Sequence, residues 1–243
     1  MKKIFTLLLL LAMMMGKNAK AQYVTIPDGF FVNWLNSHGY SSAMNGNQLN
    51  TQDAKVLTDT ILRPFYSSIT DLTGIQYFVS LKHLDCSNSH ITNLSTLPSG
   101  LLALYCDHNL LTNIPSLPPN LLKLDCDNNY LTSLPALPSS LLTFDCGGNQ
   151  LTSLPILPSN LLSLVCDWNN ADSLPTLPST LTSLDCVGNL LASLPTLPSS
   201  LNYLICNNNQ LSSLPPIPDS LGYLYCFSNQ IHCLPDLKNI HDL

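Results

Sequence analysis

A cysteine recurs every twenty residues over most of this chain of 243 residues, and no other feature constrains the fold as much. The spacing holds without an insertion or deletion at Cys86, Cys106, Cys126, Cys146, Cys166, Cys186, Cys206 and Cys226. An asparagine follows three residues behind from Asn109 to Asn229, whereas Ser89 occupies this place in the first unit. A fixed short period of this kind is typical of a solenoid in which each unit forms one turn.

Within a unit, numbered 1 to 20 from Leu101, apolar residues occupy positions 1, 4, 6, 11, 14 and 17. No single turn can bury these side chains, so they are expected to face a core that neighbouring turns share. The alternation around positions 4 and 6 predicts a short strand at positions 3–5, and stacked strands of this kind form a parallel sheet.

The remaining constant positions also have structural explanations. Asparagine at position 9 offers amide donors and an acceptor to the backbone of adjacent turns. Proline at positions 15 and 18, such as Pro135 and Pro138, favours an extended, polyproline II-like outer side. The cysteines at position 6 are expected to be buried free thiols, because in-register strands present parallel Cβ vectors that suit disulfides poorly. Only Cys233 departs from the pattern.

The consensus Leu-x-x-Leu-x-Cys-x-x-Asn-x-Leu-x-x-Leu-Pro-x-Leu-Pro-x-x resembles the short, twenty-residue bacterial class of leucine-rich repeat. It is similar to the cysteine-containing variant in exported and surface proteins of gut and environmental bacteria, and to the repeats of secreted effector proteins. The resemblance covers residues 81–237. It implies a leucine-rich-repeat solenoid with a parallel β-sheet on the concave face and an extended convex side, and it implies that ligands dock on the concave face.

Four segments are expected along the chain. Residues 1–21 read as a cleavable signal peptide, with Lys2 and Lys3 before an apolar run that is too short to span a bilayer. Residues 22–80 are expected to form a small, mainly helical N-terminal cap with a degenerate first repeat. Eight repeats follow over 81–237. Residues 238–243 form a short tail without a clear cap, so either the chain is the N-terminal fragment of a longer surface protein or something else covers the last turn.

Inside the expected cap, Asp28 is a candidate N-cap for a helix that ends near Gly39, and its expected apolar face consists of Phe30, Phe31, Trp34 and Leu35. A polar, turn-rich stretch follows over 41–52. Residues 53–62 are compatible with a short helix or with a first degenerate strand. A terminal unit of this kind covers the core that a solenoid's first turn would otherwise expose.

Charge limits the choice of partner. Removal of the signal peptide leaves five basic residues against fifteen aspartates, a formal charge of about −10. Nucleic acid is therefore not an expected ligand, because its binding needs a lysine and arginine footprint.

The variable strand positions carry two sets of candidate binding residues on the concave face. The first, the acidic strip, consists of Asp85, Asp107, Asp125, Asp127, Asp145, Asp167 and Asp185. The second, the aromatic patch, consists of Tyr203, Tyr223, Tyr225 and Phe227, and Tyr105 and Trp168 accompany the strip. Aromatic side chains beside a charged field resemble a protein-binding hot spot. Alternatively, the strip is a solvated face that keeps the protein soluble, or a missing C-terminal element covers the patch. Calcium would suit the carboxylates, although their spacing matches no calcium loop.

Catalysis is not expected. His83 with Asp85, or His108 with Asp107, would supply a base and a carboxylate, but no activated nucleophile, phosphate loop or metal-ligand spacing accompanies them. We therefore expect a non-catalytic, monomeric, exported interaction module without cofactor, metal or membrane span, which binds a protein partner through its concave face. A carbohydrate- or cell-surface-adhesion module is the alternative.

Overall fold

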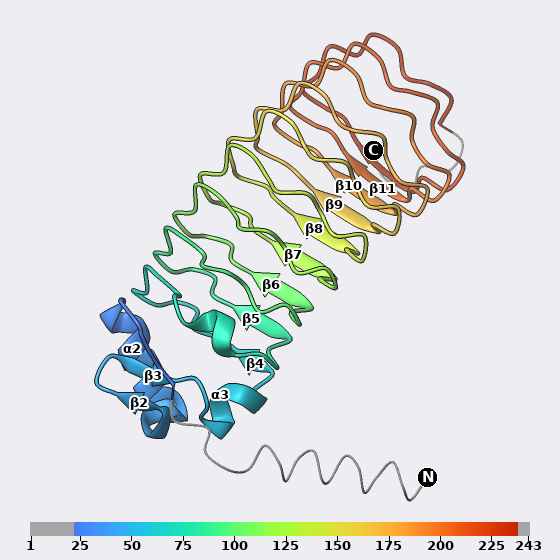
Figure 1. Cartoon of the computed structure of the whole chain (residues 1–243). Helices are drawn as coiled ribbons and strands as arrows, with labels where there is room; N and C mark the ends of the chain where they lie inside the picture. The colour runs from blue at the N-terminus through green and yellow to red at the C-terminus, as the bar shows by residue number, and fades with distance from the viewer. Residues whose placement is uncertain (1–21, 238–243) are drawn as a thin grey trace, which may run out of the picture.

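The computed structural model describes residues 22–237, and their backbone winds into a coil of stacked turns with a small cap at its N-terminal end (Figure 1). The predicted signal peptide and the tail at 238–243 lie outside the described residues. One strand from each turn joins a nine-stranded sheet in the order β12-β11-β10-β9-β8-β7-β6-β5-β4. Its neighbours pair in parallel, so the predicted parallel solenoid sheet is confirmed.

The eight strands of the repeats occupy positions 3–5 of their turns, as the alternation predicts. They are β5 (His83–Asp85), β6 (Ala103–Tyr105), β7 (Lys123–Asp125), β8 (Thr143–Asp145), β9 (Ser163–Val165), β10 (Ser183–Asp185), β11 (Tyr203–Ile205) and β12 (Tyr223–Tyr225). Each residue pairs with the residue twenty positions later, as Leu104 does with Leu124. The ninth strand, β4 (Ile61–Leu62), pairs with β5 at an offset of 22, because Ile61 lies opposite His83. A degenerate first turn is therefore present.

The core runs along the inside of the coil. Side chains at positions 1, 4, 6 and 11 are buried in nearly every turn, whereas Leu134, Leu154 and Leu174 at position 14 are only half-buried. The cysteine ladder is buried as free thiols from Cys86 to Cys206. Each ladder thiol donates to a carbonyl of the next turn; the Cys126 Sγ, for example, lies 3.3 Å from the oxygen of Asp145.

The asparagine ladder binds each turn to the one before it. Asn129 Nδ2 donates to the carbonyls of Cys106, Cys126 and Asp127 at 3.0–3.1 Å, and its Oδ1 accepts from the backbone N–H of Leu111 at 3.0 Å. One side chain thus satisfies four backbone groups from two adjacent turns, as the pattern at position 9 predicts.

The cap mixes helix and strand. Its elements are β1 (Tyr23–Thr25), α2 (Gly29–Leu35), a π-helical turn (Asn36–Tyr40), a 3₁₀ turn (Ser41–Ala43), β2 (Met44–Asn45), β3 (Gln48–Asn50), α3 (Ala54–Thr58) and a 3₁₀ turn (Ile75–Tyr77). The small antiparallel sheet β1-β3-β2 is not apparent in the polar sequence over 41–52. Residues 53–62 form both of the alternatives, since α3 is followed by β4.

Asp28 fastens this cap to the solenoid. Its Oδ1 accepts the Phe31 N–H at 2.8 Å as the N-cap of α2, and its Oδ2 accepts the backbone N–H and the hydroxyl of Thr70 at 2.7 and 2.6 Å. Burial by itself raises the pKa of Asp28, but the hydrogen bonds from Thr70, Phe31 and Asp71 outweigh it and hold the pKa below its ordinary value.

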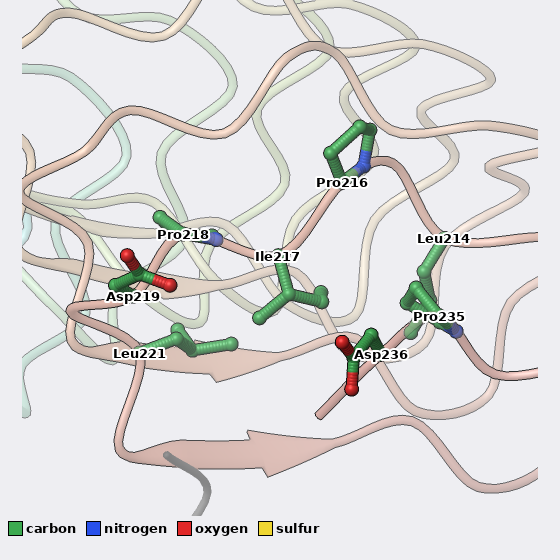
Figure 2. A pocket seen from close by; sticks show the side chains of 8 residues that line it. All are labelled: Leu214, Pro216, Ile217, Pro218, Asp219, Leu221, Pro235 and Asp236. Carbon is green, nitrogen blue, oxygen red and sulfur yellow. The ribbon is translucent and has the colours of Figure 1, made fainter. Parts of the chain in front are cut away.

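The last turn is less covered than the turns before it. A cavity of about 380 Å³ opens between the final two turns, and Leu214, Ile217 and Leu221 are among its lining residues (Figure 2). Cys226 is half-buried where Cys206 is buried, and Leu234 is 41% exposed where Leu214 is 8% exposed. The core is therefore accessible at this end of the described chain.

Candidate functional site

In-register pairing stacks the side chains of the acidic strip along the concave face. Asp125 pairs with Asp145 at position 5, between Tyr105 before them and Val165 after them. Asp107, Asp127 and Asp167 form a second column at position 7, which Gly147 interrupts. The predicted strip residues are thus gathered over neighbouring turns, and the structure places all of them half-buried rather than fully solvated.

Partial burial changes the acidity of the strip. Desolvation, together with the charges of Asp107 and Asp127, raises the pKa of Asp125 to about 6. Desolvation and neighbouring carboxylates raise the pKa of Asp145 to about 7 and that of Asp167 to about 6. Among the residues described, the one basic side chain within 4.0 Å of a strip carboxylate is that of His108, whose Nδ1 lies 3.2 Å from Oδ2 of its sequence neighbour Asp107.

Gly147 leaves a gap in the middle of the strip. A Cβ atom at this residue would lie 2.1 Å from Oδ1 of Asp167 and 3.2 Å from Oδ1 of Asp127, so the two carboxylates converge on the space that a side chain would fill. A cavity of about 260 Å³ adjoins this point, with Asp145 and Trp168 also in its lining. The carboxylates of three turns therefore meet beside one exposed aromatic ring.

Position 8 is left-handed in each turn, which determines where Trp168 lies. The residues at this position have φ of 47–63°; they are Tyr66, Asn88, His108, Asn128, Gly148, Trp168, Gly188, Asn208 and Ser228. Such a φ suits glycine and asparagine and is costly for a tryptophan. The ring of Trp168 lies over Gly188, where a Cβ would come within 2.6 Å of it, and the residue is still 59% exposed.

The tyrosines of the aromatic patch lie close together on the last two strands of the sheet, β11 and β12. The ring of Tyr203 lies 5.5 Å from that of Tyr223 and 6.2 Å from that of Tyr225. Phe227 is 62% exposed. The strip ends at Asp185 on β10, and the patch begins on the adjacent strand β11 with Tyr203.

Sequence reasoning missed a further group at the opposite end of the sheet. Continuation of the β4–β5 register places Arg63 beside Asp85, and the backbone N–H of Tyr66 bonds to Ser87 as Asn88 bonds to Asp107. Arg63 and Phe65 thus belong to the concave face. The signal was hidden because this turn is offset by 22 residues and carries Pro64 where the ladder has cysteine.

Of the side chains considered for catalysis, those of His108 and Asp107 lie within 3.2 Å of each other, whereas the cysteines from Cys86 to Cys206 are buried. Burial, with nearby carboxylates, raises the pKa of the ladder thiols such as Cys126 and Cys166, so these thiols are protonated and unreactive. No group of three or more metal-binding side chains occurs within 22–237. None of the helices in this part of the chain has the length and apolar character needed to cross a bilayer.

The architecture of this chain is similar to that of solved bacterial leucine-rich-repeat proteins. No family model matches the chain, and no curated protein matches its sequence. Among solved structures, YopM, a leucine-rich effector protein from Yersinia pestis, is 30% identical with a TM-score of 0.60, over 69% of this chain and 54% of that chain. The functional domain of InlJ from Listeria monocytogenes, which includes a cysteine ladder, is 26% identical with a TM-score of 0.63, over 90% of this chain and 55% of that chain.

The chain is a bacterial-type leucine-rich-repeat solenoid. It spans about half the length of these two structures. As a leucine-rich-repeat solenoid it has the architecture of a protein-interaction scaffold, a fold that is typically non-enzymatic.

Proposed function

We propose that this solenoid is an exported, non-catalytic module that binds a basic segment of a protein partner along the acidic strip of its concave face. The observation that carries the proposal is the convergence of Asp127, Asp145 and Asp167 from three successive turns beside Trp168. Two ionised carboxylates about 5 Å apart repel each other by about 1–3 kcal/mol at an effective dielectric constant of 20 to 60. A cation that enters the gap is attracted by both carboxylates, and this attraction offsets their mutual repulsion.

The neighbouring side chains support a protein partner. Trp168 offers an exposed ring for a cation–π contact with lysine or arginine, and the aromatic patch adds tyrosines of the kind that dominate protein-binding hot spots. Export is supported by the basic and apolar sequence of residues 1–21.

The test is binding of a fluorescent octalysine peptide to residues 22–243 at several salt concentrations. The variant Asp125→Asn/Asp127→Asn/Asp145→Asn should weaken binding at least about tenfold, because about 1.4 kcal/mol corresponds to a factor of ten. The matched control, Asp172→Asn/Asp219→Asn/Asp236→Asn, removes the same number of carboxylates outside the strip, and both variants are compared at pH 8, above the raised pKa values of the strip. Equal weakening by both variants would show a non-specific effect of net charge and refute the proposed site.

A further inference from the structure

A pocket of about 420 Å³ lies where the degenerate first turn meets the repeats. Its lining residues are Arg63, Phe65, His83, Asp85 and Tyr105. They come from three successive turns: Arg63 and Phe65 follow β4, His83 and Asp85 belong to β5, and Tyr105 belongs to β6. Phe65 is 42% exposed and Tyr105 is half-buried, so aromatic surface is available beside the polar groups.

Arg63 is the notable member of this pocket because it is the only arginine of the sequence. Two of the three lysines of the described chain bond internally: Lys55 pairs with Asp59 at 2.7 Å, and Lys82 donates to the carbonyl of Gly100 at 3.1 Å. Within 22–237, no carboxylate lies within 4.0 Å of the Arg63 guanidinium.

Asp85 does not neutralise Arg63, although the two are neighbours in register. Its Oδ1 accepts the hydroxyl of Ser87 at 2.7 Å and the Ser87 N–H at 3.3 Å. The carboxylate is therefore held toward its own strand end, and its second oxygen is available to accept an N–H from a ligand.

We propose that this pocket binds a carboxylate that the protein partner carries beside an aromatic side chain. The carboxylate bonds to the guanidinium of Arg63 in the two-pronged geometry that arginine favours, and the aromatic side chain lies between Phe65 and Tyr105. A backbone N–H of the same residue reaches Asp85. Either a chain end or an acidic residue next to an aromatic one supplies this chemistry.

The inference rests on the proposed function only for the nature of the partner. Arg63 and Asp125 stand three strands apart, which is about 14 Å at the strand spacing of a parallel sheet. A segment of four or five extended residues spans that distance. One partner segment can therefore place its anionic group at Arg63 and its basic residues on the acidic strip, which fixes its direction along the solenoid.

The pocket can be tested with small probes that have no affinity for the strip. The probes are N-acetyl-phenylalaninate for a chain end, acetyl-Asp-Phe-amide for an acidic side chain, and neutral N-acetyl-phenylalaninamide as the control. Because Arg63 is the only arginine, its Nε–H gives a single NMR signal that reports the site directly. We expect a saturable shift with both anionic probes at about millimolar concentration, and the tighter of the two identifies the source of the carboxylate.

Two variants complete the test. Arg63→Ala should abolish the probe-induced shifts of the Ser87 and Tyr105 amides, whereas Lys123→Ala removes a concave-face cation three strands away and should leave them unchanged. An equal response to the neutral probe, or equal losses in both variants, would overturn the inference. Binding of the anionic probes without binding of octalysine would support the pocket and refute the acidic strip, so the two proposals fail separately.

Discussion

At the residue scale, Asn129 shows why the constant positions of the repeat carry no ligand specificity. Its two amide N–H groups are shared among three backbone carbonyls of the coil, and its oxygen accepts one backbone N–H. The same holds for its equivalents, such as Asn149. Recognition is left to the positions whose side chains point away from the core.

Asn129→Ala should lower the free energy of unfolding by about 2–4 kcal/mol, because several backbone groups lose their partner in a dry interior. Urea unfolding followed by circular dichroism measures the change. Asn170→Ala, at an exposed position of the repeat, is the control and should change stability by less than about 0.5 kcal/mol. Similar losses in both variants would contradict the ladder's role.

Gly188→Ala should cost about 1–3 kcal/mol, since the added Cβ meets the Trp168 ring and the backbone is left-handed (φ 63°). A double-mutant cycle separates the two causes. In a Trp168→Asn background the steric part disappears and only the backbone part remains. If the cost is the same in both backgrounds, the ring does not lie on Gly188 in solution.

At the element scale, the cap depends on one carboxylate. Asp28 accepts hydrogen bonds from α2 and from the segment that begins the solenoid, so it couples two elements that are 42 residues apart. Its lowered pKa means that its stabilising effect is present above the unfolded pKa of about 3.9 and is lost as the pH falls through the folded value.

Asp28→Asn should therefore lower the free energy of unfolding by about 1–3 kcal/mol at pH 7, and by progressively less as the pH falls through the lowered folded pKa of Asp28. Hydrogen exchange should show the loss first in residues 22–80. The half-buried Asp53, which caps only α3 through the Lys55 N–H, provides the comparison through Asp53→Asn. Uniform loss of protection over all turns would show that Asp28 does not act locally on the attachment of the cap.

Features that follow the twenty-residue period can be predicted from the sequence, whereas those that depart from it cannot. The strands of the repeats, the buried thiols and the stacked strip follow from a strict twenty-residue period, because every turn repeats the same geometry. The turn of Arg63 breaks that period by two residues and lacks the cysteine, so its place in the pocket with Phe65 is visible only once the β4–β5 pairing is known. The sheet β1-β3-β2 was hidden for another reason, since its strands of two or three residues are too short for alternation to indicate.

At the scale of the whole molecule, the acidic strip makes stability depend on pH in the direction opposite to Asp28. The folded pKa values of Asp125, Asp145 and Asp167, about 6, about 7 and about 6, are above the unfolded value. Between pH 8 and pH 5 the folded protein therefore binds more protons than the unfolded chain does. This contribution is fully present below the unfolded pKa and is lost as the pH rises through 6 and 7.

The melting temperature should accordingly rise by about 2–6 °C between pH 8 and pH 5. Asp145→Asn should raise it at pH 8 and flatten the profile, whereas Asp172→Asn, at an exposed position outside the strip, should leave the slope unchanged. Calorimetry at low salt measures both. A wild-type profile that falls from pH 8 to pH 5 would contradict the raised pKa values.

The twenty-residue register has one more consequence, which concerns distance. Because each turn adds one strand to the sheet, the Arg63 pocket, the acidic strip and the aromatic patch stand at whole multiples of about 4.8 Å from one another. A gain or loss of one twenty-residue unit between the Arg63 pocket and the aromatic patch would therefore change the distance between these two sites by one strand spacing and leave the residues of both unchanged. Partners could be told apart by the spacing of their charges alone.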